Sequence, residues 1–250
     1  MIDSKKMVLL LAMIAGTAVS AHPIFTFEAN AEKKLPENVK VVKKYAPNGI
    51  TWTDDGTGKF AIDTDGMPKK GAPLTIRDPR IDAICTAGFT VEIKFKPRLR
   101  KNNPNYGKPK HSFTNEVLLN LGSAYAGKGF FVKIFNNDLG FGVQRKQWSS
   151  MHINYNLTKH KDQWMDMAFV YDPVNKYLAI YKDGKLVRRK AIKEQGHVCK
   201  EPLLIGGERT NWTFDGLISK IVLTPRAKSA QELSNAGKEI QQAAKKLEDL

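Results

Sequence analysis

The sequence predicts an all-β protein in which two antiparallel sheets face each other as a sandwich, followed by one helix at the C-terminal end. Apolar and polar residues alternate over short runs along most of the chain, which is the period of a strand with one buried face. Glycine, proline, asparagine and aspartate separate the runs. Helical spacing of apolar residues stands out only after residue 228. With 250 residues, 42% of them hydrophobic, the chain is long enough to enclose one full core.

The alternation is clearest at residues 89–95 (FTVEIKF), where odd-numbered positions are apolar and even-numbered positions are mostly polar. Asp183-Gly184 joins two later runs and predicts a type I′ hairpin turn, because that turn needs positive φ at both central residues. Further strands are expected at residues 116–121, 129–135, 140–143, 165–171, 177–182, 185–192, 203–205 and 217–224, with weaker ones at 39–42, 60–63 and 74–76.

Residues 229–250 are expected to form a helix that packs on the sandwich or trails from it. Ser229 and Glu232 have the spacing of a capping box, in which each side chain binds the other residue's backbone N–H. Apolar residues then recur at helical intervals from Leu233 to Leu247. The sandwich itself is expected to span residues 22–228 as one domain.

The first 21 residues have the pattern of a signal peptide. Lys5 and Lys6 give a positive start, residues 7–19 form an apolar run that is short for a membrane span, and Ala21 ends a small-residue cleavage pattern. No later stretch of the sequence is apolar enough to cross a bilayer. We therefore expect an exported protein, secreted or periplasmic, without a transmembrane anchor.

The chain is strongly basic, with a formal net charge of +15 and a pI near 9.7. Such a charge attracts anionic partners. Acidic glycans are favoured over nucleic acid, because no nucleic-acid-binding motif accompanies the charge and export separates the protein from nucleic acid. The cysteines Cys85 and Cys199 form an even pair in an oxidising compartment, so we expect a disulfide between them, the alternative being two buried free thiols.

Several segments, taken in order, resemble the laminin-G-like jelly-roll domains of the concanavalin A-like lectin/glucanase superfamily. They are FTVEIKF at 89–95, QWMDMAFVYD at 163–172, LAIYKDGKLV at 178–187, LIGG at 204–207, FDGLI at 214–218 and SAQEL at 229–233. The resemblance implies a jelly-roll sandwich, a fold that hosts lectins, glycan hydrolases, lyases and adhesion modules. Relatives that carry calcium imply carboxylate ligands, for which the candidates here are Asp63, Asp65 and Asp215.

Residues 144–163 are predicted to form a long loop, and long loops in compact domains are commonly functional. The loop combines basic side chains, which pair with anions, and aromatic rings, on which sugars stack. A second candidate loop follows Gly207. The candidate ligand-binding residues are Arg145, Lys146, Trp148 and Tyr155 in the first loop and Arg209, Asn211 and Trp212 in the second.

No catalytic residues are predicted. The related hydrolases carry the run Glu-x-Asp-x-x-Glu, which supplies two carboxylates about 5 Å apart, and this run is absent here. One enzymatic alternative is a copper site, in which His22 would become the N-terminal residue after cleavage. Its second ligand would be His111, His152, His160 or His197.

We therefore favour an exported, non-catalytic carbohydrate-binding or adhesion module for acidic glycans. The alternatives are a polysaccharide-processing enzyme of the same fold, acting as a hydrolase or lyase, and a structural module that binds other proteins.

Overall fold

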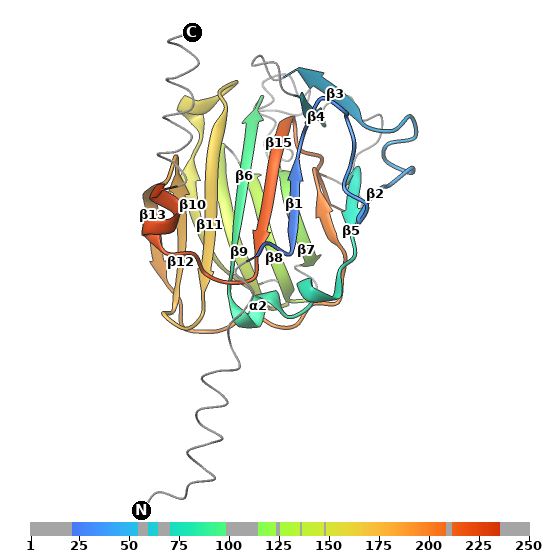
Figure 1. Ribbon diagram of the computed structural model, residues 1–250. Coiled ribbons are helices and arrows are strands. Elements are labelled where there is room, and N and C mark those ends of the chain that lie inside the picture. The colour runs from blue at the N-terminus through green and yellow to red at the C-terminus, as the bar shows by residue number, and fades with distance from the viewer. Residues whose placement is uncertain are drawn as a thin grey trace, which may run out of the picture.

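Two antiparallel sheets pack face to face in the computed structural model of the protein (Figure 1). The structure describes residues 22–54, 60–64, 71–98, 115–123, 126–135, 137–147, 149–208 and 212–235. Most strands turn the larger share of their apolar residues into the space between the sheets and many of their polar residues outward. The all-β sandwich predicted from the sequence is thereby confirmed.

Sheet A forms one layer. Its strands in the described chain are β1 (Phe25–Glu28), β3 (Thr51–Asp54), β4 (Phe60–Asp63), β6 (Phe89–Pro97), β11 (Met165–Asp172), β12 (Tyr177–Lys182), β13 (Lys185–Ala191) and β15 (Gly216–Thr224). They are ordered β13-β12-β11-β6-β15-β4-β3, and β1 also pairs with β15. Strands β6 and β15, far apart in the sequence, are thus neighbours at the centre of this sheet.

Sheet B forms the other layer. Its described strands are β2 (Val39–Val41), β5 (Leu74–Ile76), β7 (Asn115–Ser123), β8 (Lys128–Phe135), β9 (Asp138–Lys146), β10 (Ser149–Asn156) and β14 (Leu203–Ile205), in the order β10-β9-β8-β7-β14-β5-β2. The connections contain the short helices η1 (Pro79–Ile81), α2 (Ile84–Ala87) and η2 (Thr158–His160). Strands β10 and β13 lie at the same edge of the sandwich, where the two layers contact each other.

Aromatic side chains join the two sheets in the core. Phe89 of β6 lies with its ring centroid 4.6 Å from that of Phe130 on β8 and 5.9 Å from that of Phe141 on β9. Phe141 also packs on Phe169 of β11, with the centroids 5.5 Å apart. All four rings are 0% exposed, so they fix which residues of β8 and β9 can face outward.

The sequence correctly predicted the hairpin between β12 and β13. Asp183 and Gly184 have φ angles of 51° and 75°, as a type I′ turn requires. At the C-terminal end, residues 230–235 are helical, and the capping box is present: the Glu232 backbone N donates to Ser229 Oγ (3.2 Å) and the Ser229 backbone N donates to Glu232 Oε2 (2.8 Å). Leu233 packs against the outer face of sheet A, and residues 236–250 lie outside the described part of the chain.

Three strands were missed. β1 (FTFE) and β3 (TWTD) are only four residues long, and such short runs resemble loops. The larger error concerns residues 144–163, predicted as a loop: most of this stretch is the end of β9 and the whole of β10. β10 (SSMHINYN) does alternate, with Met151, Ile153 and Tyr155 turned toward the core and polar residues between them, but this edge strand is short and its outward face is wholly polar, so it was not recognised as a strand.

The expected disulfide is wrong, because Cys85 and Cys199 are free cysteines. Both side chains belong to the hydrophobic core, with exposed fractions of 0% and 2%. There they pack as small apolar groups, and burial raises the pKa of each thiol. An oxidising compartment permits a bond, but the bond also requires a specific approach of the two Cβ atoms, which the sequence does not encode directly.

Replacing Phe169 with alanine should lower the free energy of unfolding by about 3–5 kcal/mol, because it leaves a cavity beside Phe141 in the core. Urea denaturation followed by tryptophan fluorescence measures this loss. The control is Val174→Ala, at a position 79% exposed, which should change stability by less than about 0.5 kcal/mol. Equal effects of the two substitutions would contradict the proposed core.

In the native protein, both cysteines should react slowly with a water-soluble thiol reagent, because the reactive thiolate is disfavoured in a buried apolar site. Two thiols per chain should react at once after unfolding in guanidinium without reductant. The colour released by the reagent measures the number of thiols. Fewer than two thiols in the unfolded, unreduced protein would mean that the cysteines are oxidised.

Candidate functional site

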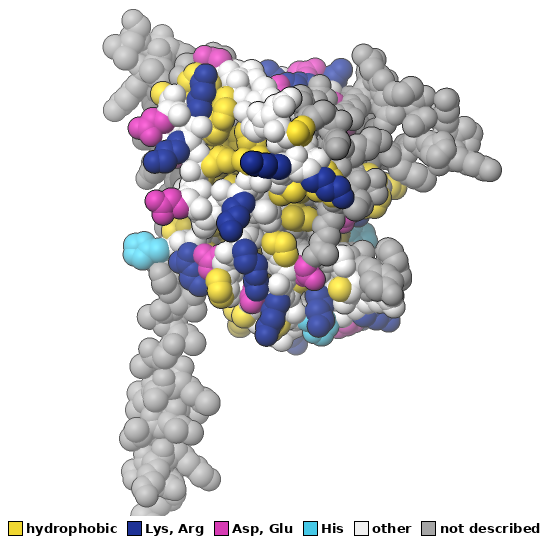
Figure 2. Space-filling view, turned by 90° about the vertical axis from the view of Figure 1, so that its right-hand side faces the viewer, with side chains coloured by type: hydrophobic (Ala, Val, Ile, Leu, Met, Phe, Trp, Pro, Cys, Tyr) yellow, Lys and Arg dark blue, Asp and Glu magenta, His cyan; other side chains and the backbone are white. Residues whose placement is uncertain are grey.

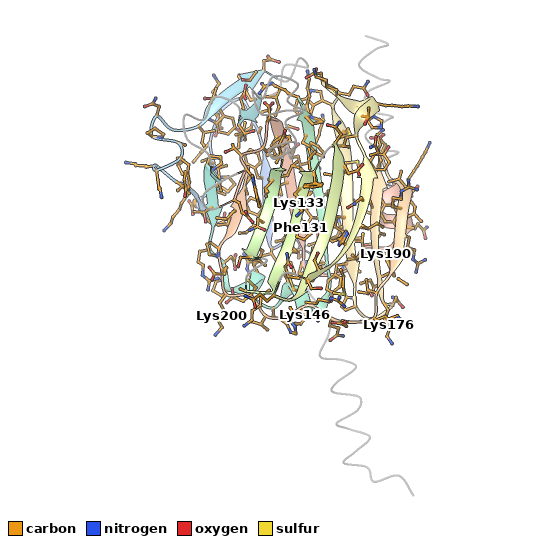
Figure 3. The ribbon with its side chains drawn as sticks, turned by 180° about the vertical axis from the view of Figure 1, so that it is seen from behind. Phe131, Lys133, Lys146, Lys176, Lys190 and Lys200 are labelled. Atoms are coloured by element: carbon orange, nitrogen blue, oxygen red, sulfur yellow. The ribbon has the colours of Figure 1, made fainter. Side chains whose placement is uncertain are left out.

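The outer face of sheet B contains a strip without side chains. On β9, Phe141 points into the core, so Gly140 and Gly142 point outward. Lys133 and Phe131 of β8 pair with these two glycines and point the same way. We call this surface the glycine face and define it by Phe131, Lys133, Gly140, Gly142, Gln144, His152 and Asn154. It is turned toward the viewer in Figure 3, with Phe131 and Lys133 near the middle of the sheet.

The ring of Phe131 lies across the neighbouring strand β9, next to Gly142. A Cβ atom placed on Gly142 would come 2.5 Å from Phe131 Cζ and 2.9 Å from the Cβ of His152. A larger residue at 142 would therefore push the ring away from the sheet. Phe131 is only 6% exposed, although it points away from the core. The absence of a side chain at Gly142 thus lets an aromatic ring pack directly on the backbone, on the outside of the sandwich.

Lys133 covers the same ring. Its ammonium nitrogen is 4.5 Å from the ring centroid of Phe131, a cation–π distance. Burial lowers the pKa of the Lys133 ammonium, and the carboxylate of Glu208 opposes this shift. Burial likewise raises the pKa of Glu208, opposed by Lys133. The two groups are therefore partly removed from water and close enough to interact electrostatically.

Polar side chains border the ring on the β10 side. His152 and Asn154 are exposed, and Asn154 Oδ1 would lie 3.1 Å from a Cβ atom on Gly140. Ser150 Oγ is 3.4 Å from Nδ1 of His152. The backbone carbonyl of His152 accepts a hydrogen bond from Lys190 Nζ of β13 at 3.0 Å. Imidazole and amide groups that can donate or accept hydrogen bonds therefore line this side of the face.

Gln144 follows Gly140 and Gly142 on the outward side of β9. It is 7% exposed, and among the described residues its Oε1 atom is buried without a hydrogen-bond partner. An unpaired buried amide oxygen costs about 1–3 kcal/mol. An acceptor that is unpaired within the described chain is therefore buried beneath the glycine face, and a ligand could reach it only if the Gln144 side chain turned outward.

Sequence reasoning missed the glycine face. The available signal was Gly140-Phe141-Gly142, because two glycines at positions i and i+2 of a strand leave one side of it bare. The second signal was Phe131-Val132-Lys133 on the preceding strand, which puts an aromatic and a basic residue on one side. Only the pairing of β8 with β9 shows that the two signals meet.

The first set of sequence-predicted site residues is separated in the structure. Arg145 and Lys146 end β9, whereas Tyr155 pairs with Leu139 at the other end of the hairpin. The strand between Ser149 and Tyr155 covers about 20 Å, at ~3.3 Å per residue. These residues therefore do not form one site.

Arg145 and Tyr155 also have partners within the chain. The Arg145 guanidinium donates to Ser149 Oγ at 2.8 Å and pairs with Glu194 Oε1 at 2.5 Å. Tyr155 packs against the core, and its hydroxyl is 3.1 Å from His160 Nε2. Both side chains stabilise local structure, and Lys146 remains exposed.

Trp212 is the described member of the second candidate loop. It is 40% exposed, and its carbonyl accepts a hydrogen bond from the Val117 backbone N at 3.1 Å. Val117 is the β7 partner of Lys133, so Trp212 borders the glycine face. The candidates Trp148, Arg209, Asn211 and Asp65 lie outside the described residues.

The described calcium candidates, Asp63 and Asp215, converge on an arginine. The Arg98 guanidinium donates to both oxygens of Asp63 at 2.9 and 2.7 Å, and its Nη1 lies 3.7 Å from Asp215 Oδ1. Asp215 is only 4% exposed. A positive group that belongs to the chain thus stands between these two carboxylates.

The histidines considered for copper lie on different elements. His22 begins the described chain, His152 is on β10, His160 is in η2 and His197 precedes β14, while His111 lies outside the described residues. Among the residues that the structure describes, no three His, Cys, Asp or Glu side chains meet in a group that could hold a metal ion. In that same part of the chain, no helix has the length and apolar character needed to cross a membrane.

The positive charge is spread over the molecule. Figure 2 views the edge that carries β2, β3 and β5 and shows Lys and Arg side chains over much of it, with acidic side chains between them. Figure 3 labels further lysines, with Lys146 and Lys200 toward the lower end of the sheets and Lys190 toward the edge on the right of the view. Net charge alone therefore does not locate a site.

A model of the concanavalin A-like lectin/glucanases superfamily matches residues 68–234. The chain belongs to this superfamily, and the resemblance found in the sequence is confirmed. Comparison with curated proteins found no significant match.

Solved structures of toxin binding domains share the fold. The binding domain of Paraclostridial Mosquitocidal Protein 1 superposes with a TM-score of 0.66 at 15% identity, over 88% of this chain and 52% of that one. The Botulinum Neurotoxin serotype G binding domain gives 0.64 at 14% identity, over 88% and 51%. A Botulinum Neurotoxin DC binding domain in complex with SialylT gives 0.60 at 13%, over 87% and 51%. This chain spans about half the length of these domains, and at such identities the likeness shows the fold alone.

Replacing Arg98 with methionine should lower the free energy of unfolding by about 2 kcal/mol, because it removes two charge-assisted hydrogen bonds to Asp63 and the ion pair with the buried Asp215. The control is Arg77→Met. The Arg77 side chain is 48% exposed and pairs with Asp82, so its loss should cost under about 1 kcal/mol. Urea denaturation with and without calcium measures both. No difference between the variants would contradict the role of Arg98, and stabilisation of the wild type by calcium would support the calcium site.

Proposed function

We propose that this protein is an exported, non-catalytic carbohydrate-binding module for acidic glycans, and that the glycine face is its binding site. The observation that carries the proposal is the arrangement of an aromatic ring, exposed amide and imidazole groups and an unpartnered amide oxygen on one open face of a lectin-like sandwich. Export rests on the signal-peptide pattern of residues 1–21.

The chemistry of the face suits a sugar. Sugar hydroxyls both donate and accept hydrogen bonds, and the side chains of Asn154 and His152 do the same. Among the residues that the structure describes, Gln144 Oε1 is an unpaired acceptor buried beneath this face, and a hydroxyl would satisfy it if the side chain turned outward. Phe131 lies beside these polar groups beneath Lys133 and is 6% exposed, so its ring becomes an apolar floor when the lysine side chain moves aside. A mostly apolar floor with a few placed polar groups is typical of small-ligand sites.

The preference for acidic glycans rests on charge. The net charge of +15 raises the local concentration of any polyanion. The exposed lysines Lys146 and Lys200 lie beyond one end of the glycine face, where they would contact the parts of a long glycan that extend past the Phe131 ring. Trp212 at the margin of the face would add a second aromatic contact.

Related folds support a glycan as the class of ligand. A Botulinum Neurotoxin DC binding domain forms a complex with SialylT, and cell entry of botulinum neurotoxin type C is dependent upon interaction with two ganglioside molecules. Those statements concern chains about twice as long as the part that matches here. They favour a glycan as the class of ligand and leave its identity to experiment.

Wild-type protein should bind acidic oligosaccharides on a glycan array, and replacing both His152 and Asn154 with alanine should weaken that binding about tenfold or more, through lost hydrogen bonds. Titration calorimetry with the tightest array ligand measures the affinity. Asn30→Ala, at an exposed position outside the glycine face, is the control and should bind as the wild type does.

Two results would overturn the proposal. One is a wild-type protein that binds no saccharide, acidic or neutral. The other is a double variant that folds normally and binds with unchanged affinity, since the site would then lie elsewhere.

A further inference from the structure

We infer that Lys133 is the residue that distinguishes acidic from neutral glycans. Its ammonium would pair with a carboxylate or sulfate of the sugar that binds at the Phe131 ring. This inference rests on the proposed function and identifies the specificity-determining residue of the same face. It depends on the position of one cation, and not on the overall charge.

The ammonium of Lys133 lies over the Phe131 ring. Lys133 is on β8 next to β9, and its nitrogen is 4.5 Å from the centroid of that ring. The ring is held between the bare backbone at Gly142 on one side and the lysine on the other. Any ligand that reaches the ring therefore meets Lys133 first.

Among the described residues, the Lys133 ammonium has no carboxylate at ion-pair distance. Within the described part of the chain, no ion pair within 4.0 Å joins Lys133 to a carboxylate, whereas Arg98 and Arg145 have such partners. Glu208 acts on Lys133 only through space. Lys133 is thus partly dehydrated without a direct anionic partner, and a partly dehydrated cation gains more from a new anion than a hydrated one does.

The position of Lys133 over the ring favours sugars that carry an anionic group. A neutral sugar must displace the ammonium from the ring and can offer it only hydroxyl groups. A uronic acid or sulfated sugar offers an anion and draws the long lysine side chain toward itself, which uncovers Phe131 for the apolar face of the sugar. The site therefore selects sugars in which an anionic group stands next to an apolar ring face.

The test compares Lys133→Met with Lys40→Met. Methionine keeps much of the length of the side chain and removes the charge. Lys40 is an exposed lysine on β2 of the same sheet, at the far edge, so both variants change the net charge equally. The ligands are the tightest acidic oligosaccharide from the array and its carboxyl-reduced or desulfated counterpart, and titration calorimetry gives each affinity.

We expect Lys133→Met to weaken binding of the acidic oligosaccharide about tenfold, the effect of one charge-assisted contact, and to leave binding of the neutral counterpart unchanged or tighter. Lys40→Met should bind both as the wild type does. Lys133→Arg should retain the acidic preference, which keeps the test decisive if the methionine variant folds poorly. In the wild type, the NMR signal of ¹³C-dimethylated Lys133 should shift on saturation with the acidic ligand.

The outcomes separate the two proposals. If the wild type binds no glycan, the proposed function fails. If the wild type binds but Lys133→Met and Lys40→Met have equal effects, or the Lys133 signal does not move, this inference is overturned and the binding function stands. Equal binding of single-stranded DNA and the acidic oligosaccharide, reduced equally in both variants, would mean that charge alone drives association and would overturn the inference as well.

Discussion

The contact of Phe89 with Phe130 and Phe141 is the interaction on which the rest of the structure depends. It joins the centre of sheet A to two adjacent strands of sheet B by buried aromatic rings. Because side chains alternate along a strand, fixing Phe130 and Phe141 inward fixes their neighbours outward. A one-residue slip of β8 would bury Lys133 and expose Phe130, and a slip of β9 would expose Phe141, so the core enforces the register that creates the outer face.

That outer face is unusual because its centre has little side-chain bulk of its own. Gly140 and Gly142 remove it from β9, and Phe131 from the next strand fills the space. The ring is therefore supported by backbone, which cannot move aside without breaking the ladder. Lys133 then lies above a rigid surface, and this explains how an exposed sheet can hold a partly dehydrated charge.

Charge has different roles at different places in this basic protein. Arg98 and Arg145 are used inside the chain, where they pair with Asp63 and Glu194 and hold loops and hairpin ends in place. Lys190 covers the free edge of β10 by binding its backbone carbonyl. Counting basic residues in the sequence cannot separate these structural cations from those available to a ligand, since the difference lies in their partners.

The sequence by itself determined the fold class, the order of most strands, the Asp183-Gly184 turn and the cap at Ser229, because each depends on local alternation or local turn chemistry. The sequence left β10 ambiguous, because its short alternation stands among polar and basic residues that also suit a loop, and it did not determine the free state of Cys85, which depends on packing. Only the tertiary structure brought the ring of Phe131 onto the glycines of the next strand, because cross-strand pairing joins residues whose separate signals are weak.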